Sequence, residues 1–224
     1  GIVGLIPAGV TINSASFKGS IESKSRYLGE IAEQNNGTIT NCKVNSMSAG
    51  DNNVYFGGLA GINSGTIGTG NVIESNTTLT GKKILGGFVG KNIGTVSLGT
   101  KIDTDNVKLT VDNKSGSAIG VIIGENASDK TIDLKELNLI KNVTVSSAEF
   151  AGGIVGINGS NHIICHSEVN NLLQNDPNSS NVRYQLANVS EADKYNKYGI
   201  SIAVSVSDVD NFGLIVGRNE GSIT

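Results

Sequence analysis

The stretch Gly57-Gly58-Leu59-Ala60-Gly61-Ile62-Asn63-Ser64-Gly65-Thr66-Ile67 is the fullest of seven copies of one short motif. With Gly61 as the reference position, the copies are centred on Gly4, Glu33, Gly61, Gly90, Gly124, Gly156 and Gly217. The steps between these positions are 29, 28, 29, 34, 32 and 61 residues. A recurrence of about 20–50 residues is typical of chains built from stacked structural repeats. The motif therefore indicates the fold before any single residue does.

Apolar residues and asparagines recur at fixed places in the copies. The series two residues before the reference is apolar throughout: Ile2, Ile31, Leu59, Phe88, Ile122, Ile154 and Ile215. Two further apolar series follow the turn glycine: Ile39, Ile67, Val96, Ile132 and Ile223, then Val44, Val72, Ile102 and Leu137. An asparagine stands two residues after the reference in six copies: Asn35, Asn63, Asn92, Asn126, Asn158 and Asn219. The first copy has Ile6 there instead.

These series fit a chain that winds once per repeat and stacks each coil on the one before. Strands rise about 3.3 Å per residue, so a coil of about 29 residues holds three short strands and their bends. Equivalent apolar side chains would then stack as internal columns, and the asparagines would form a hydrogen-bonded ladder at a bend. We predict an all-β fold, a right-handed parallel β-solenoid (β-helix) of about seven coils.

One position does not fit simple strand alternation. The residue beside the inward series is also apolar, as in Ala60 next to Leu59. Strict alternation would place it outside, where a strip of such residues could dock a partner. We expect instead that a bend between these two positions turns both side chains inward.

We expect one solenoid domain over residues 1–224, with an inserted loop at 170–199. The insertion accounts for the last, doubled step and holds Pro177 and three of the five tyrosines. The chain begins in mid-motif and stops just after a turn, so we expect it to be a segment of a longer protein. It holds no run of about 20 apolar residues, so we expect no membrane insertion.

The repeated phrase resembles the GLUG motif, as in Gly86-Gly87-Phe88-Val89-Gly90-Lys91-Asn92-Ile93-Gly94-Thr95-Val96. That motif is found in secreted and wall-attached bacterial proteins, including IgA-cleaving metallopeptidases and adhesins. The resemblance covers nearly the whole chain and implies a bacterial, secreted or cell-surface protein. It departs at Glu33, at the lengthened turn 127–130 and after Val169. In such proteins the repeats are accessory to the part that acts.

Composition argues against several classes of function. The net charge is −3 with both signs mixed along the chain, so there is no basic surface for nucleic acid. Aromatic residues make up 4 % and tryptophan is absent, which argues against a surface on which sugars or bases stack. The glycine clusters lack the following helix of a phosphate-binding loop. We expect no cofactor.

The metal-ligating residue types are sparse. Cys42 and Cys165 lie four copies apart, about 19 Å, beyond the roughly 7 Å that a disulfide spans, so both should be free thiols. In His162-Ile163-Ile164-Cys165-His166 a strand would separate the histidines by about 13 Å and point the thiol the other way, which disfavours a zinc site. The chain has no His-Glu-x-x-His, so it should hold no metallopeptidase centre itself.

Two carboxylate pairs, Asp103 with Asp105 and Asp208 with Asp210, would lie about 7 Å apart on a strand face. That distance overlaps the carboxyl separation of glycoside hydrolases, and β-helices do host carbohydrate-active enzymes. No lysine or arginine companion recurs near the two pairs, so solvated strand ends are the simpler interpretation. Asp103 and Asp105 could alternatively hold calcium through oxygen ligands at a bend.

The inserted loop is the strongest candidate for recognition. Arg183, Tyr184, Tyr195 and Tyr198 are residue types enriched at contact surfaces, and long loops are often functional. A flap that only covers the solenoid is the alternative. We expect a non-enzymatic, adhesin-like stem that presents a binding region to a host or matrix protein or glycan. The alternatives are a substrate-positioning segment of an extracellular metallopeptidase and a carbohydrate-active β-helix.

Overall fold

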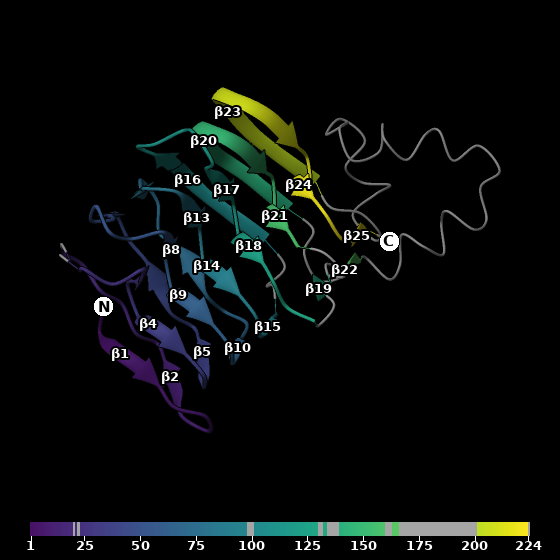
Figure 1. Ribbon diagram of the computed structural model, residues 1–224. Helices are drawn as coiled ribbons and strands as arrows, with labels where there is room; N and C mark the ends of the chain where they lie inside the picture. Colours follow the sequence, from purple (N-terminus) through teal and green to yellow (C-terminus); the bar gives the residue numbers. More distant parts are fainter. Residues whose placement is uncertain are drawn as a thin grey trace.

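The computed structural model describes residues 1–19, 21, 23–97, 101–129, 132–133, 139–159, 163–165 and 201–223. These residues form strands joined by turns and bends, and no helix. Every strand pair is parallel, as in a chain that winds and returns to the same side at each turn. The predicted all-β, parallel β-solenoid is confirmed. Figure 1 shows the successive turns stacked along one axis, from β1 near the N-terminus to β24 at the other end.

The motif itself forms the first sheet, which has seven strands and follows chain order. Each strand covers the four residues that end on the asparagine position. They are β1 (Val3–Ile6), β4 (Ala32–Asn35), β9 (Ala60–Asn63), β14 (Val89–Asn92), β18 (Ile123–Asn126), β21 (Val155–Asn158) and β24 (Val216–Asn219).

The remaining sides of the solenoid are shorter sheets. One has four strands: β2 (Thr11–Asn13), β5 (Thr38–Thr40), β10 (Thr66–Ile67) and β15 (Thr95–Val96). A second has two strands, β6 (Lys43–Val44) and β11 (Val72–Ile73). A third has three: β19 (Ile132–Asp133), β22 (Ile163–Cys165) and β25 (Ser222–Ile223).

The last sheet has nine strands and includes the three longest of the molecule. Its members are β3 (Tyr27–Gly29), β7 (Met47–Ser48), β8 (Tyr55–Gly57), β12 (Thr78–Gly81), β13 (Ile84–Gly86), β16 (Lys101–Val111), β17 (Ala118–Gly120), β20 (Leu139–Gly152) and β23 (Ser201–Gly213). The early turns reach this sheet as two short strands each, whereas β20 and β23 each cross it as one continuous strand.

The winding amounts to about four turns, so the expected seven coils are wrong. All seven motif copies contribute to the first sheet, but only four strands build the second sheet. Each copy of the motif therefore forms one strand of the first sheet and the bend before it. Whether the rest of that turn contains further strands depends on the segment between copies.

The interior is one continuous core of stacked apolar side chains. Ile31, Leu59, Phe88, Ile122 and Ile154 are all buried, and so are Ile39, Ile67, Val96 and Ile132. Burying each such side chain stabilises the fold by about 1.5–3 kcal/mol. The two ends differ, because Ile2 and Ile223 lack a neighbour on one side and are 44 % and 46 % exposed.

The bend expected between Leu59 and Ala60 is confirmed. Strand β8 ends at Gly57 and β9 begins at Ala60, so Leu59 lies between two strands. Both Leu59 and Ala60 are fully buried. The change of chain direction turns two consecutive side chains inward, and no exposed apolar strip exists at this position in the described turns.

The third apolar series is wrong at two of its four members: Val72 is misplaced by one residue, and Ile102 lies on β16 in the nine-stranded sheet, where it pairs with Ile140, while Leu137 lies outside the described residues. Val44 pairs with Ile73, and Val72 pairs with Lys43. Ile73 is therefore buried, and Val72 is on the outside with 42 % exposure. Because strand side chains alternate, a shift of one residue exchanges inside for outside. The extra residue lies in the turn around Gly70, which has a left-handed backbone (φ 76°).

The last two motif copies are direct neighbours. Strand β21 pairs with β24 and β22 pairs with β25, although the two copies lie 61 residues apart in the sequence. Their asparagines, Asn158 and Asn219, are aligned in this pairing. Cys42 is a buried free thiol, as expected.

Candidate functional site

Four of the residues expected to bind a partner, Arg183, Tyr184, Tyr195 and Tyr198, lie outside the described residues. The same holds for His162 and His166. Cys165 ends strand β22, and only its backbone is described. The recognition role of the 170–199 segment and the zinc question therefore stay predictions.

The six asparagines lie in register along the first sheet and form a chain of side-chain hydrogen bonds. Each Nδ2 group donates to the Oδ1 atom of the next asparagine, over 2.7, 2.8, 3.2, 2.9 and 2.9 Å from Asn35 to Asn219. Several Oδ1 atoms also accept a hydrogen bond from the backbone N–H two residues later in the chain; for example, the Gly37 N–H donates to Asn35 Oδ1. Buried amides need such partners, so the ladder both satisfies them and fixes the turn.

Asp103 and Asp105, the calcium candidates, both lie on β16. Asp103 belongs to β16 and pairs with Lys141 through the strand register, and its side chain is not described. Asp105 is exposed, its N–H donates to Ser75 Oγ at 3.4 Å, and its carbonyl accepts from Asn76. In the described part of the chain no three acidic, histidine or cysteine side chains gather to hold a metal. The hypothesis of a calcium ion held by Asp103, Asp105 and carbonyl oxygens stays a prediction.

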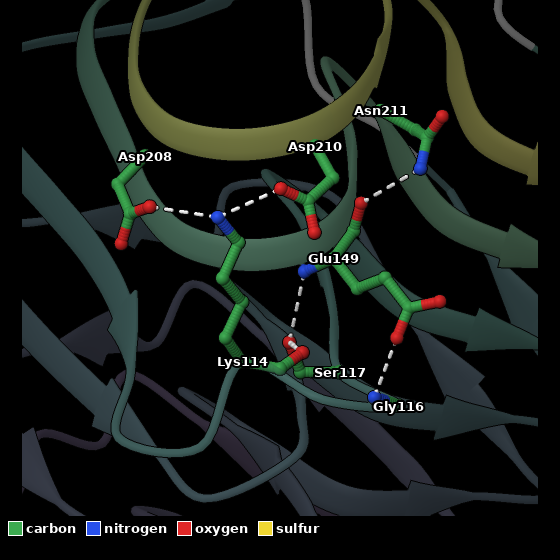
Figure 2. Close-up of polar contacts among 7 residues, drawn as sticks. All are labelled: Lys114, Gly116, Ser117, Glu149, Asp208, Asp210 and Asn211. Atoms are coloured by element: carbon green, nitrogen blue, oxygen red, sulfur yellow. Dashed lines mark hydrogen bonds and ion pairs between the residues drawn. The ribbon is translucent and has the colours of Figure 1, made fainter.

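The second carboxylate pair does have a basic companion, contrary to expectation. Lys114, in the turn before β17, places its Nζ atom 2.7 Å from Asp208 Oδ1 and 2.8 Å from Asp210 Oδ1. Figure 2 shows this side chain reaching over strand β20 to the two carboxylates on β23. Lys114 and Asp208 are 94 positions apart in the sequence. Only the winding of the chain brings them together.

The electrostatics of this cluster make it a poor catalytic pair. Hydrogen bonds to both carboxylates raise the pKa of Lys114, and the bond from Lys114 lowers the pKa of Asp208. Each group is thereby held in its charged form near neutral pH, whereas a general acid or base must exchange a proton there. The side chains of Asp208 and Asp210 are also more than half exposed.

A network of backbone contacts supports the cluster. Glu149, on β20, accepts the N–H of Gly116 at 2.6 Å, and its own N–H donates to Ser117 Oγ at 3.1 Å. Asn211 Nδ2 donates to the Glu149 carbonyl at 3.3 Å (Figure 2). These bonds fix the turn that carries Lys114 against the two long strands.

A second group of side chains, the lateral aromatic cluster, combines residues from the nine-stranded and the seven-stranded sheets. It comprises Tyr27, Tyr55, Lys91 and Glu125. The two tyrosine rings stack at 5.4 Å, and Tyr55 donates its hydroxyl to Glu125 at 2.9 Å. Lys91 pairs with Glu125 at 2.8 Å and lies 5.2 Å from the Tyr55 ring centre. Burial, then the Glu125 charge, raises the pKa of Tyr55.

One buried carboxyl group escaped the sequence analysis. Glu30 has no exposed surface, and only one of its two oxygens is hydrogen-bonded. Burial raises its pKa to about 8, although hydrogen bonds from Asn45 act in the opposite direction. The detectable signal was the substitution itself, because the equivalent residue in the next two copies is Gly58 and Gly87.

Comparison with protein-family models, with curated proteins and with solved structures gave no match. None of the described segments forms a helix with the length and apolar character needed to cross a membrane. The arguments about function therefore start from the residues and contacts of this chain.

Proposed function

We propose that this chain is a non-catalytic structural and binding module, an adhesin-like stem of a bacterial secreted or cell-surface protein. The observation that carries the proposal is the asparagine ladder, which joins six of the seven strands of the first sheet through side-chain hydrogen bonds, four of them buried. Such a continuous linkage suits a part that must keep its shape while it holds another part at a distance. The resemblance to the GLUG repeat is consistent with this role.

The polar clusters favour a structural role over a catalytic one. Lys114 forms ion pairs with both Asp208 and Asp210, and Lys91 is paired with Glu125. In each case the partners come from different turns, so the ion pairs connect turns. We expect the catalytic step of any parent protein to be performed outside these residues.

Recognition by the 170–199 segment is tested by replacing it with a short Gly-Ser linker. Because β21 and β24 pair directly, the solenoid should keep its circular dichroism spectrum without the segment. The two proteins are compared on arrays of matrix proteins and glycans. We expect binding by the intact chain and its loss in the variant; retained binding would move recognition to the solenoid faces.

The non-catalytic proposal is tested with polysaccharide substrates. No cleavage is expected from the intact chain. If reducing ends accumulate, and Asp103→Asn with Asp105→Asn abolishes them while Asp208→Asn does not, the chain is a carbohydrate-active enzyme and the stem proposal fails.

A further inference from the structure

Glu30 occupies a position that points into the solenoid. A Cβ atom at the equivalent Gly58 would lie 2.4 Å from a methyl group of Val44, and one at Gly87 would lie 3.0 Å from Ile73. Both neighbours belong to the buried core. The Glu30 side chain is therefore directed toward the interior at the level of the first turn, where it is completely buried.

The carboxyl group interrupts the backbone pairing between the first two turns. Its Oε2 atom accepts the N–H of Asn45 at 2.8 Å, and Oε1 has no hydrogen-bond partner. Next to it the pairing is regular, since Lys43 N–H donates to Ala15 at 2.9 Å. The Asn45 side chain donates instead to the Phe17 carbonyl at 2.7 Å. Glu30 thus lies at the junction that holds the first turn.

Few charges act on this carboxyl group. The α-amino group of Gly1 is the charged group whose field lowers its pKa. Lys43 and Glu74, on the adjacent strand edge, pair with each other at 2.8 Å on the outside of the sheet. Lys18 and Lys24 are exposed. No basic side chain among the described residues forms an ion pair with Glu30.

The first turn, residues 1–19, is lightly attached. It contacts the second turn through the β1–β4 and β2–β5 pairs and one bridge between Ser16 and Lys43. Ile2, Leu5 and Val10 of this turn are 44 %, 50 % and 43 % exposed.

This turn covers the Cys42 thiol. The N–H of Ala15 donates to Cys42 Sγ at 3.4 Å, and Sγ lies 3.8 Å from the carbonyl of Ile12. Cys42 has no exposed surface while the turn is in place. The reactivity of the Cys42 thiol toward a soluble reagent therefore measures whether residues 1–19 are attached.

We propose that the junction between residues 1–19 and the turn that carries Glu30 is pH-dependent: residues 1–19 stay paired with that turn while Glu30 carries a proton and separate from it when Glu30 loses the proton. An ionised carboxylate in the core lacks water and a positive partner, whereas separation of the turn hydrates it. In the open state the pKa of Glu30 returns to its ordinary 4.5, against about 8 in the closed state. Opening therefore increases between these values by about tenfold per pH unit, and is constant below and above them.

The test measures how fast maleimide modifies Cys42 between about pH 5 and pH 9, in a Cys165→Ser background. Each rate is divided by that of the urea-unfolded protein at the same pH, which removes the thiol's own titration. We expect the normalised rate of the parent protein to rise on the order of 100-fold or more over this range. Glu30→Gln should make it independent of pH. Glu33→Gln, a nearby carboxyl group on the outside, should behave as the parent.

Hydrogen exchange of residues 1–19 supplies a second readout. Their amide protection should fall over the same pH range in the parent protein and not in Glu30→Gln. Equal pH dependence in the two proteins would overturn the proposal, as would faster Cys42 modification without loss of protection in residues 1–19. If Glu30→Gln fails to fold, Glu30→Gly serves as the neutral variant in its place, because the equivalent positions in the next two copies hold Gly58 and Gly87.

Discussion

At the residue scale, the repeated glycines are explained by lack of space and not by unusual dihedral angles. A Cβ atom at Gly61 would lie 2.5 Å from the backbone nitrogen of Leu28, in the previous turn. At the equivalent Gly4 no atom lies within 4 Å. Glu33 is tolerated because the adjacent β3 is the edge strand of the nine-stranded sheet, so no further strand lies beneath it. The motif glycine therefore marks contact between turns.

Alanine at Gly61 should consequently destabilise the protein, whereas alanine at Gly4 should not. The Gly61→Ala methyl group must push β3 and β9 apart, at a cost of about 3 kcal/mol. Urea unfolding of the two variants measures the difference. Equal midpoints would mean that the turns are not in contact at this glycine.

The asparagine ladder predicts a graded response to substitution. Asn92 is buried and bonds to Asn63 and Asn126, so Asn92→Ala leaves buried amide groups unpaired and should cost about 2–4 kcal/mol. Asn219, exposed at the end of the ladder, accepts from one asparagine only. The unfolding midpoint should fall much less in Asn219→Ala. Similar losses in both variants would show that the amides act independently of their neighbours.

The sequence predicted the residues that repeat better than those that differ. The inward apolar series was visible because all seven copies have it, and the asparagines because six of the seven copies have them. Glu33 was noticed because it replaces the reference glycine, but Glu30 was not, because that position also holds Val121 and Leu214. The substitution alone shows that Glu30 differs from Gly58 and Gly87, and it does not show that the carboxyl group is buried, since burial depends on which turn packs against it.

At the element scale, the long strand β23 is held by contacts that skip a turn. Lys114 passes over β20 to reach Asp208 and Asp210 (Figure 2). The pairing of Asp208 and Asp210 with Lys114 could not be predicted from the sequence. It depends on how the turn before β17, strand β20 and strand β23 are placed relative to one another in the fold. The predicted inward position of Val72 was wrong for a related reason. The turn around Gly70 has one residue more than the corresponding turn of the preceding copy, so Val72 pairs with Lys43 and not with Val44.

Removal of the Lys114 charge should loosen β23 in a salt-dependent manner. In Lys114→Met, amide exchange in β23 should be faster than in the parent protein at low ionic strength. The difference should vanish in about 1 M salt, where charges are screened within about 3 Å. The exposed Lys108 on β16 gives the matched control, Lys108→Met, which should leave exchange in β23 unchanged. A difference that persists at high salt would indicate lost packing rather than lost charge.

Acid should have the same effect as the substitution. The folded-state pKa of Asp208 is lowered, so its ion pair contributes stability above the ordinary pKa of 3.8 and loses it as the pH falls below. In Lys114→Met this part of the acid dependence of β23 exchange should be absent. The comparison needs only the parent protein and this one variant.

At the scale of the whole molecule, each turn contacts its neighbours and little else. The stability of such a stack is approximately a sum of turn and interface contributions, so the ends open first. The first sheet illustrates the gradient: β1 and β24 each have one partner, and β14 has two (Figure 1). The number of turns could not be predicted from the motif count, because the segments between motifs vary in length.

The hydrogen-exchange rate of each strand of the first sheet should therefore depend on how far the strand lies from the ends of the stack and not on its residue types. We expect protection to be greatest in β14 and to decrease toward β1 and β24, measured at a pH below 6 where Glu30 keeps its proton. Uniform protection of all seven strands would show instead that the solenoid opens as a single unit.

The ladder of asparagines also has a direction. Every amide donates toward the next copy and accepts from the previous one, so the bond dipoles from Asn35 to Asn219 add up instead of cancelling. The two extremities of the row are chemically unlike: Ile6 offers no hydrogen to Asn35, while Asn219 turns its amide to the Gly221 carbonyl. The molecule thus has a built-in polarity along its axis, and a coil docked at one extremity would meet a different hydrogen-bonding surface from a coil docked at the other.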